Sequence, residues 1–362
     1  MKERRKRNMS RTGLLFMFCL LMLCGCAQIT GFMENTEVSG REVESLAAEK
    51  EDDTVLLGGM PVGIYMETDG VLVLDTEKMT GMDGKEYTPA QGVVSSGDYI
   101  TEVNHQKIEG KKQLMDLVEH LDGEKVLLTV RRENTILEKK LTPVQISKGN
   151  YRLGIWVRDN VQGLGTITFL TKNNRFAALG HGIHDIDTST LLTIKRGTLY
   201  RTSIQKVQKG SKGNPGTMEG IIVYNRFHQL GVIGKNTDAG IYGELNSDRS
   251  WIGEEVPIQV AKKEEIKTGE ARIRCYIDGE VKEYTICITQ IDKESDQVNK
   301  GMVIQVTDTE LLEKTGGIIQ GMSGSPIIQN GKLIGAVTHV FVQDSTKGYG
   351  IFIENMLKEE ES

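Results

Sequence analysis

The chain has 362 residues, of which 38% are hydrophobic and 26% charged, a composition typical of soluble globular domains apart from its first segment. At this length two domains are expected, and a net charge of −6 argues against a nucleic acid as the main partner. The 41 glycines, against 6 prolines, favour many turns and therefore a mainly β fold.

Residues 1–30 have the pattern of an export signal or membrane anchor. Several basic residues precede the apolar run "GLLFMFCLLMLCGCAQ", which is short for a bilayer-spanning helix of about 20 residues and suits a signal-peptide core. "LCGC" also resembles a bacterial lipobox, which would make Cys26 an acylated anchor, so an uncleaved signal anchor and a lipoprotein both remain open. Residues 31–55 are polar and acidic, which predicts a linker between the membrane and the body.

Residues 56–145 combine short strand patterns with one helical pattern. The helix is predicted over 110–123, where apolar residues recur at helical spacing in "GKKQLMDLVEHLDG". Just before it, "GDYITEVNHQKIEG" joins an apolar strand to a turn at Asn104. This order resembles a PDZ domain, whose "GD-I-x-x-V/I-N" strand and following helix it matches from Gly97 onward.

A PDZ-like domain predicts a peptide ligand, added as an extra strand at a sheet edge beside the amphipathic helix. In that family the terminal carboxylate of the peptide lies against a glycine-rich loop. "GGMPVGIYM" (58–66) is the candidate loop, with Gly59, Val62, Gly63 and Ile64 as the peptide-binding residues, although it departs from the usual G-L-G-F form. We therefore expect a peptide tail bound in cis or in trans, or alternatively a small α+β domain without a peptide ligand.

Residues 150–362 consist mostly of short apolar runs separated by Gly, Asn and Asp, a pattern typical of a sandwich or a pair of barrels. Cys275 and Cys287, the two cysteines outside the N-terminal segment, flank a predicted hairpin. That hairpin would place Cys275 opposite Lys282, too far from Cys287 for a disulfide bond.

The stretch "QGMSGSPIIQNGKLIGAVTHV" (320–340) contains the candidate nucleophile, Ser323. The G-x-S-x-G elbow of α/β-hydrolases needs a helix after the serine, whereas a hairpin with a type I′ turn at Asn330-Gly331 is predicted here. A glycine-rich loop that leads the serine directly into a strand pair is the chymotrypsin-like arrangement. In it, the backbone N–H groups of Gly321 and Ser323 would form the oxyanion hole.

A serine nucleophile needs a base, normally a histidine, because its own hydroxyl is scarcely ionised at neutral pH. His181, in "FAALGHGIHD", follows an apolar strand and lies between glycines, as a base at a loop tip would. His184 is the immediate rival, and His339 is expected to pack inside the terminal strand. His181-x-x-His184 could also bind a metal, but no Cys or carboxylate motif accompanies the pair, so neither a metal nor a cofactor is expected.

The acidic partner of the base has more than one candidate in the sequence. Asp308 lies 15 residues before the serine in "VTDTELLEKTGG", which predicts a short helix. There it also suits a helix N-terminus, beside a capping box of Thr307 and Glu310. Asp185 and Asp187, next to the histidines, are the alternatives.

The run "VTDTELLEKTGGIIQGMSGSPIIQNGKLIGAVTHVFVQDSTKGYGIFIENML" resembles the C-terminus of the SpoIVB peptidases, stage IV sporulation proteins of endospore-forming bacteria. "ALGHGIHDIDT" resembles their histidine motif, and the order of membrane segment, PDZ domain and serine peptidase domain also fits. Carried over residue by residue, the resemblance implies Ser323 as the nucleophile, His181 as the base and Asp308 as the aspartate.

The resemblance also implies a fold and a function. We expect a mainly β chain, with a PDZ-like α+β domain at 56–145 followed by a chymotrypsin-like β-barrel serine peptidase domain at 150–362. The implied activity is that of a membrane-anchored serine endopeptidase that cleaves itself and a membrane-associated protein between forespore and mother cell. Cutting that protein would release a membrane metalloprotease that processes a late sigma factor. The alternative is a non-enzymatic scaffold that works through its PDZ-like domain.

Overall fold

The computed structural model describes residues 54–361 with the exception of 247 and 249. The expected signal or anchor at 1–30 and almost all of the expected linker at 31–55 lie outside the described residues. Within the described part of the chain, no helix is long and apolar enough to cross a membrane.

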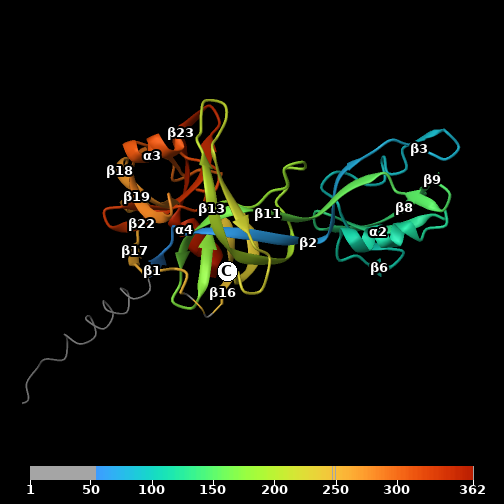
Figure 1. Ribbon diagram of the computed structural model, residues 1–362, viewed down its shortest axis with the longest axis horizontal. Coiled ribbons are helices and arrows are strands. Elements are labelled where there is room, and N and C mark those ends of the chain that lie inside the picture. The colour runs from blue at the N-terminus through green and yellow to red at the C-terminus, as the bar shows by residue number, and fades with distance from the viewer. Residues whose placement is uncertain (1–53, 247, 249, 362) are drawn as a thin grey trace, which may run out of the picture. The chain divides into compact units, whose positions relative to one another are not determined.

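Six antiparallel strands close into a first barrel, which carries the histidine loop. Each strand pairs with the next around the ring, and the last pairs back with the first (Figure 1). Alternate residues such as Val62, Ile64 and Met66 fill its interior, because successive side chains of a strand point to opposite faces. In ring order the strands are β2 (Pro61–Thr76), β11 (Ile155–Leu170), β12 (Arg175–Ala178), β16 (Gly240–Leu245), β15 (Gln229–Thr237) and β13 (Ile194–Gln208).

Six more antiparallel strands close into a second barrel, which carries the serine loop. Its interior is filled by buried aliphatic side chains such as Ile273, Ile286 and Ile304. In ring order the strands are β18 (Gly269–Ile277), β19 (Glu280–Ile291), β20 (Met302–Val306), β23 (Asp344–Phe352), β22 (Lys332–Phe341) and β21 (Pro326–Gln329). The expectation of a mainly β, chymotrypsin-like barrel fold is confirmed.

Short elements join the two barrels. β1 pairs with β11 and with β17, and β17 in turn runs parallel to β22. β14 pairs with β13 and passes the serine loop, where the Met218 N–H donates to the Gln320 carbonyl at 2.9 Å. The elements not yet located are β1 (Thr54–Leu57), β14 (Thr217–Ile222), β17 (Pro257–Val260), a 3₁₀ helix (Lys263–Glu265), α3 (Thr309–Thr315) and α4 (Ile353–Glu361).

The PDZ-like domain is an α+β unit built around α2 (Lys111–Glu119), which lies within the predicted helical segment. Leu114 on this helix is buried in a core with Val71, Ile100 and Leu128. The second half of β2 and the start of β11 complete its sheet (Figure 1). Its other strands are β3 (Met79–Thr80), β4 (Glu86–Tyr87), β5 (Tyr99–Val103), β6 (Gln106–Lys107), β7 (Val126–Arg132), β8 (Thr135–Leu141), β9 (Val144–Ser147) and β10 (Asn150–Arg152).

The segment 58–66, predicted as a peptide-binding loop, leads into and forms the start of β2 in the first barrel. Val62, Gly63 and Ile64 pair with β11 on one side and with β13 on the other. Gly59 immediately precedes this strand, and its N–H donates to the Ile167 carbonyl at 2.8 Å. Because both edges of the strand are already paired, a peptide cannot be added there, which corrects the prediction.

Candidate active site

The serine loop of the second barrel is held by a strand of the first. Buried Thr166 and Thr168 on β11 donate their hydroxyl groups to the carbonyl oxygens of Gly321 (2.9 Å) and Gly324 (2.8 Å). The Thr166 N–H also donates to the Ser323 carbonyl at 2.9 Å. The position of Ser323 therefore depends on contacts between the two barrels as well as on its own loop.

The position directly after the serine requires glycine, and a turn with positive φ values follows it. Gly324 has φ +94°, and a Cβ there would lie 2.0 Å from the Thr166 carbonyl oxygen and 2.5 Å from the Leu179 nitrogen. Beyond the loop, Asn330 and Gly331 both have positive φ, 52° and 76°, and join β21 to β22. This is the geometry of a type I′ turn, so the predicted hairpin after the serine is confirmed.

The loop leaves two backbone amides available on either side of residue 322. Among the hydrogen bonds of the described residues, the N–H groups of Gly321 and Ser323 have no acceptor, whereas the Gly324 N–H donates to the Val337 carbonyl at 2.8 Å. Free N–H groups beside a nucleophile are what an oxyanion hole requires. This arrangement is compatible with the predicted oxyanion hole at Gly321 and Ser323, whose role stays a prediction.

Ser323 and His181 converge on the same stretch of β22. The Ser323 hydroxyl donates to the Thr338 carbonyl at 2.7 Å. The His181 ring packs on the ring of the next residue, His339, with their centroids 4.6 Å apart and their planes 34° apart. No hydrogen bond joins Ser323 to His181 within the described part of the chain. Such bonds are often made only once substrate is bound, and here the serine side chain would have to leave the Thr338 carbonyl first.

The His181 ring has the tautomer of a general base. Its Nδ1 lies 2.9 Å from the Gly182 carbonyl oxygen, which can only accept a hydrogen bond, so the ring proton belongs on Nδ1 and Nε2 keeps its lone pair. Burial lowers the pKa of His181 from its ordinary value; the Gly182 carbonyl opposes this shift, and His184 adds to it. The ring is therefore neutral, and able to accept a proton, at pH 7.

His339 is a second neutral histidine at the site. Burial, followed by repulsion from His181 and Lys300, lowers its pKa to about 4. Its Nδ1 is buried and has no partner among the described residues. The ring thus acts here as packing for His181, in keeping with its expected place in the terminal strand.

His184, the rival base, lies three residues after His181 and contacts other groups. Its Nδ1 lies 3.2 Å from the Gly182 carbonyl oxygen, and its Nε2 lies 3.5 Å from Oδ1 of Asp238. In residues 54–361, with 247 and 249 left aside, no group of three or more His, Cys, Asp or Glu side chains is placed to hold a metal ion.

The structure does not bring Asp308 to the histidine. Its carboxylate caps α3, where Oδ1 accepts from the Leu311 N–H at 3.1 Å, and Oδ2 accepts from the Thr285 N–H at 3.2 Å. Neither oxygen contacts His181 in the part of the chain that is described. The helix cap is thus Asp308 itself, one residue after the predicted Thr307, and a catalytic role for Asp308 stays a prediction.

The alternative acids, Asp185 and Asp187, hold the loop that follows the histidines. Buried Asp185 accepts from the N–H groups of Asp187 (3.0 Å) and Thr188 (2.9 Å), and its other oxygen pairs with Arg158. Asp187 also pairs with Arg158, at 2.8 Å. Both carboxylates are therefore committed to loop structure and arginine pairing.

A groove that sequence reasoning missed lies between α2 and the start of β11. It has a volume of about 410 Å³ and is lined by Leu114, Met115 and Val118 of the helix and by residues 150–157. In the described ladder, Ile155–Arg158 pairs with β2 on one side only. An unpaired strand edge beside an amphipathic helix is the geometry in which a peptide adds to a sheet.

A signal for this groove was present in the sequence. Leu153-Gly154-Ile155 has the apolar–Gly–apolar form that PDZ domains show in their carboxylate-binding loop. Gly154 has φ +68°, and a Cβ there would lie 3.0 Å from the Glu77 carbonyl oxygen, so glycine is required. This motif lies almost a hundred residues after the predicted loop at 58–66.

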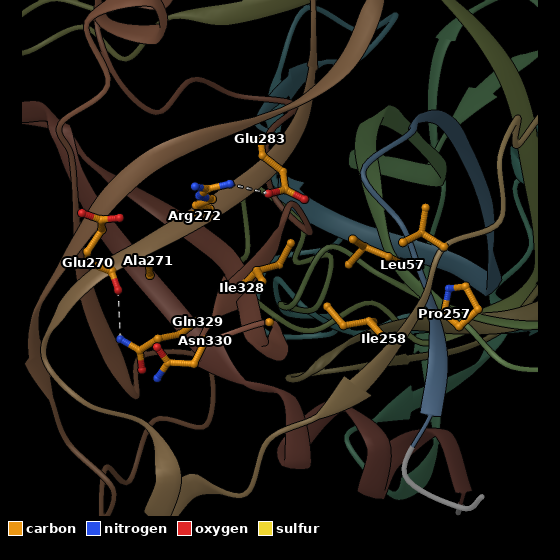
Figure 2. A pocket seen from close by; sticks show the side chains of 12 residues that line it. Leu57, Pro257, Ile258, Glu270, Ala271, Arg272, Glu283, Ile328, Gln329 and Asn330 are labelled. Atoms are coloured by element: carbon orange, nitrogen blue, oxygen red, sulfur yellow. Dashed lines mark hydrogen bonds and ion pairs between the residues drawn. The ribbon is translucent and has the colours of Figure 1, made fainter.

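A separate recess of about 490 Å³ opens where β1, β17, β18 and β21 meet (Figure 2). Its charged side chains Arg272 and Glu283 pair with each other at 3.4 Å, and Gln329 donates to the Glu270 carbonyl at 3.2 Å. No residue of the serine or histidine loops lines it. It holds neither the candidate serine nor the candidate histidine, so the chemistry is sought at the loops around Ser323 and His181.

Comparison with known proteins gives matches to peptidases and to a PDZ domain. A protein of Helicobacter pylori (strain J99) described as a putative zinc metalloprotease is 28% identical over 180 residues, 43% of this chain and 50% of that protein. The chain thus spans about half the length of this curated relative. The PDZ domain of the SdrC-like protein of Listeria monocytogenes is 24% identical with a TM-score of 0.20, over 25% of this chain and 87% of that one.

Two solved proteases are also similar. The Rv3671c protease of M. tuberculosis is 16% identical with a TM-score of 0.31, over 56% of this chain and 73% of that one. The HtrA-type protease AlgW is 12% identical with a TM-score of 0.32, over 56% and 53%. Residues 149–357, more than half of the chain, match the family described as SpoIVB peptidase S55. The chain therefore belongs to the SpoIVB peptidase S55 family of serine peptidases.

Proposed function

We propose that this chain is a membrane-tethered serine endopeptidase with Ser323 as its nucleophile and His181 as its base. The observation that carries the proposal is the meeting of both residues at Thr338 and His339 of β22, beside two loop amides that have no acceptor among the described residues. Family membership supports the same reaction class.

In the proposed reaction, the Ser323 oxygen bonds to the scissile carbonyl carbon while its proton passes to Nε2 of His181. The N–H groups of Gly321 and Ser323 hold the oxyanion. Collapse breaks the C–N bond, and His181 returns the proton to the leaving amine. Water then adds to the acyl-enzyme by the same route and frees the serine.

The proposed substrates are the chain itself and a membrane-associated regulatory protein during sporulation, whose cleavage would trigger sigma-factor processing. The family match supports this role, and the basic and apolar segment at 1–30 supports export and anchoring. The proposed location is the space between forespore and mother cell. In addition, we propose that the groove between α2 and β11 binds a peptide tail, in cis or in trans.

A matched pair of serine variants tests the activity. The full chain is purified in detergent micelles and incubated alone, and its fragments are identified by mass spectrometry. Self-cleavage is expected in the wild type and is expected to fall by about 10⁵- to 10⁶-fold, below detection, in Ser323→Ala. Ser325→Ala is the control, because this buried serine lies in the same loop and its hydroxyl has no partner among the described residues.

Self-cleavage that continues unchanged in Ser323→Ala would contradict the proposed nucleophile. A chain that cleaves neither itself nor an unfolded protein such as casein, yet still binds peptides, would favour the scaffold alternative instead. The groove beside α2 is the feature that keeps this second function in consideration.

A further inference from the structure

His181 lacks an anionic partner in the described structure. Its Nδ1 proton is held by the Gly182 carbonyl at 2.9 Å, which fixes the tautomer but carries no full charge. When the ring takes the proton of Ser323 it becomes an imidazolium, and a carboxylate stabilises that cation far better than a carbonyl does. The site is therefore incomplete as a proton acceptor unless an acid lies within reach.

The pairing of β12 with β16 identifies which acid can reach it. Ala177 pairs with Tyr242, and Ala178 pairs with Ile241. Continued by three residues in each direction, the same antiparallel register sets His181 opposite Asp238, and residues opposite each other in a ladder direct their side chains to the same face. The chain leaves regular strand geometry at Leu179 and Gly180, which have φ +71° and +68°, so the register gives proximity rather than a contact.

Contacts between the two loops keep this proximity beyond the last ladder pair. Asn236 accepts from the Ile183 N–H at 2.8 Å and donates to the Ile183 carbonyl at 2.9 Å. A Cβ on Gly182 would lie 2.6 Å from the Thr237 carbonyl oxygen. The two residues after His181 are thus packed on the two residues before Asp238, which keeps the two loops together next to both side chains.

Compared with Asp308 and Asp185, Asp238 has the carboxylate with the fewest partners among the described residues. Its side chain is exposed, and among the described residues its only partner is Nε2 of His184, at 3.5 Å. By contrast, Asp308 and Asp185 each have both oxygens engaged by backbone amides or an arginine. If the Asp238 carboxylate changes its partner from His184 to His181, it loses one contact and no helix cap is broken.

We infer that Asp238 is the positioning residue of the peptidase, and that its carboxylate takes over the Nδ1 proton of His181 from the Gly182 carbonyl during the reaction. Asp308 then serves as the cap of α3, and His184 holds the carboxylate in the resting state. The inference rests on the proposed function, since it assigns a partner to the proposed base.

The test measures how fast a fluorophosphonate modifies Ser323 in the full chain in detergent micelles. In this reaction the serine oxygen bonds to phosphorus, fluoride leaves and the serine proton passes to His181, so the maximal rate reports the base without requiring a known substrate. Asp238→Asn is expected to lower this rate at least about 100-fold, and by less than the roughly 10⁴-fold seen where loss of an aspartate also changes the tautomer. The reagent concentration at half-maximal rate and the thermal midpoint are expected to stay unchanged.

Two further variants separate positioning from structure. Asp238→Glu keeps the carboxylate and is expected to recover most of the rate, whereas Asp308→Asn is expected to lower the thermal midpoint and to leave the rate of the folded fraction within about threefold of wild type. Modification of Asp238→Asn at the wild-type rate, or equal rates in the Asn and Glu variants, would overturn the inference while leaving the proposed function intact. A folded wild-type chain that takes no label at all would overturn the proposed function and this inference with it.

Discussion

At the scale of single residues, the site contains two neutral histidine rings, His181 and His339, packed on each other with their centroids 4.6 Å apart. Each ring would repel the other if both were protonated, and burial already disfavours the charged form of both. The neutral state of His181 follows from its burial, which is the main cause of its lowered pKa, and it is the state that a general base needs before it receives a serine proton.

This packing predicts an acid sensitivity of the fold. The pKa of His339 is about 4 in the folded chain against an ordinary 6.5, so between these values the unfolded chain binds a proton that the folded chain excludes. Stability is therefore expected to fall as the pH drops from 6.5 towards 4. Urea midpoints of the full chain at pH 7, 6 and 5 measure this change.

His339→Phe is the matched variant for that measurement, because it keeps a ring beside His181 and removes the titrating group. Its urea midpoint is expected to depend less steeply on pH over the same range. An identical pH dependence in both proteins, or a wild-type chain that gains stability on acidification, would contradict the assigned shift.

Residue-level features that depend on neighbours in the sequence could be predicted. The turn at Asn330-Gly331 and the pairing of Cys275 with Lys282 are both confirmed, because each is fixed by a short hairpin. The proximity of Asp238 to His181 could not be predicted, since it depends on strands more than fifty residues apart. Local sequence does not set that register.

At the scale of elements, β2 and β11 each run from the first barrel into the PDZ-like domain. Gly70 sits in the middle of β2 with φ +89°, and "TDG" in the sequence has the composition of a turn that would end a strand. The strand nevertheless runs from Pro61 to Thr76, and it pairs with β11 on both sides of Gly70, with a register shift between the two stretches. The prediction that the PDZ-like domain starts at residue 56 therefore assigned to this domain residues of β2 that belong to the first barrel.

The groove between α2 and β11 makes a prediction at this scale. Met115 is an exposed apolar residue that lines the groove, and Met115→Glu, in a Ser323→Ala background, is expected to weaken peptide binding about tenfold or more. The measurement uses an immobilised peptide library with free C-terminal carboxylates and a matched amidated copy. The free carboxylates are expected to bind better, because the peptide end would lie at the loop of Leu153 to Ile155.

Ile136→Glu provides the control for this prediction. Ile136 is also an exposed apolar residue of the PDZ-like domain, but it lies on β8 and does not line the groove. Equal loss of binding in both variants, or no preference for free carboxylates, would contradict a peptide site between α2 and β11.

At the scale of the whole described chain, two six-stranded barrels meet at the serine loop, which Thr166 and Thr168 attach to the first barrel. The barrel class could be predicted from many short apolar runs, and the nucleophile loop from its glycines. The closure of each barrel and the sharing of strands with the PDZ-like domain depend on long-range pairing, which a linear pattern does not encode. The assembled site is thus a property of the fold as a whole.

The activated serine can be located directly by covalent labelling. The folded full chain is treated with a fluorophosphonate at neutral pH and digested, and the adduct is mapped by tandem mass spectrometry. One dominant adduct is expected, on Ser323, and it is expected to disappear when the chain is unfolded before treatment. An adduct on another serine, or one on Ser323 that survives unfolding, would contradict the claim that the fold activates Ser323 through His181.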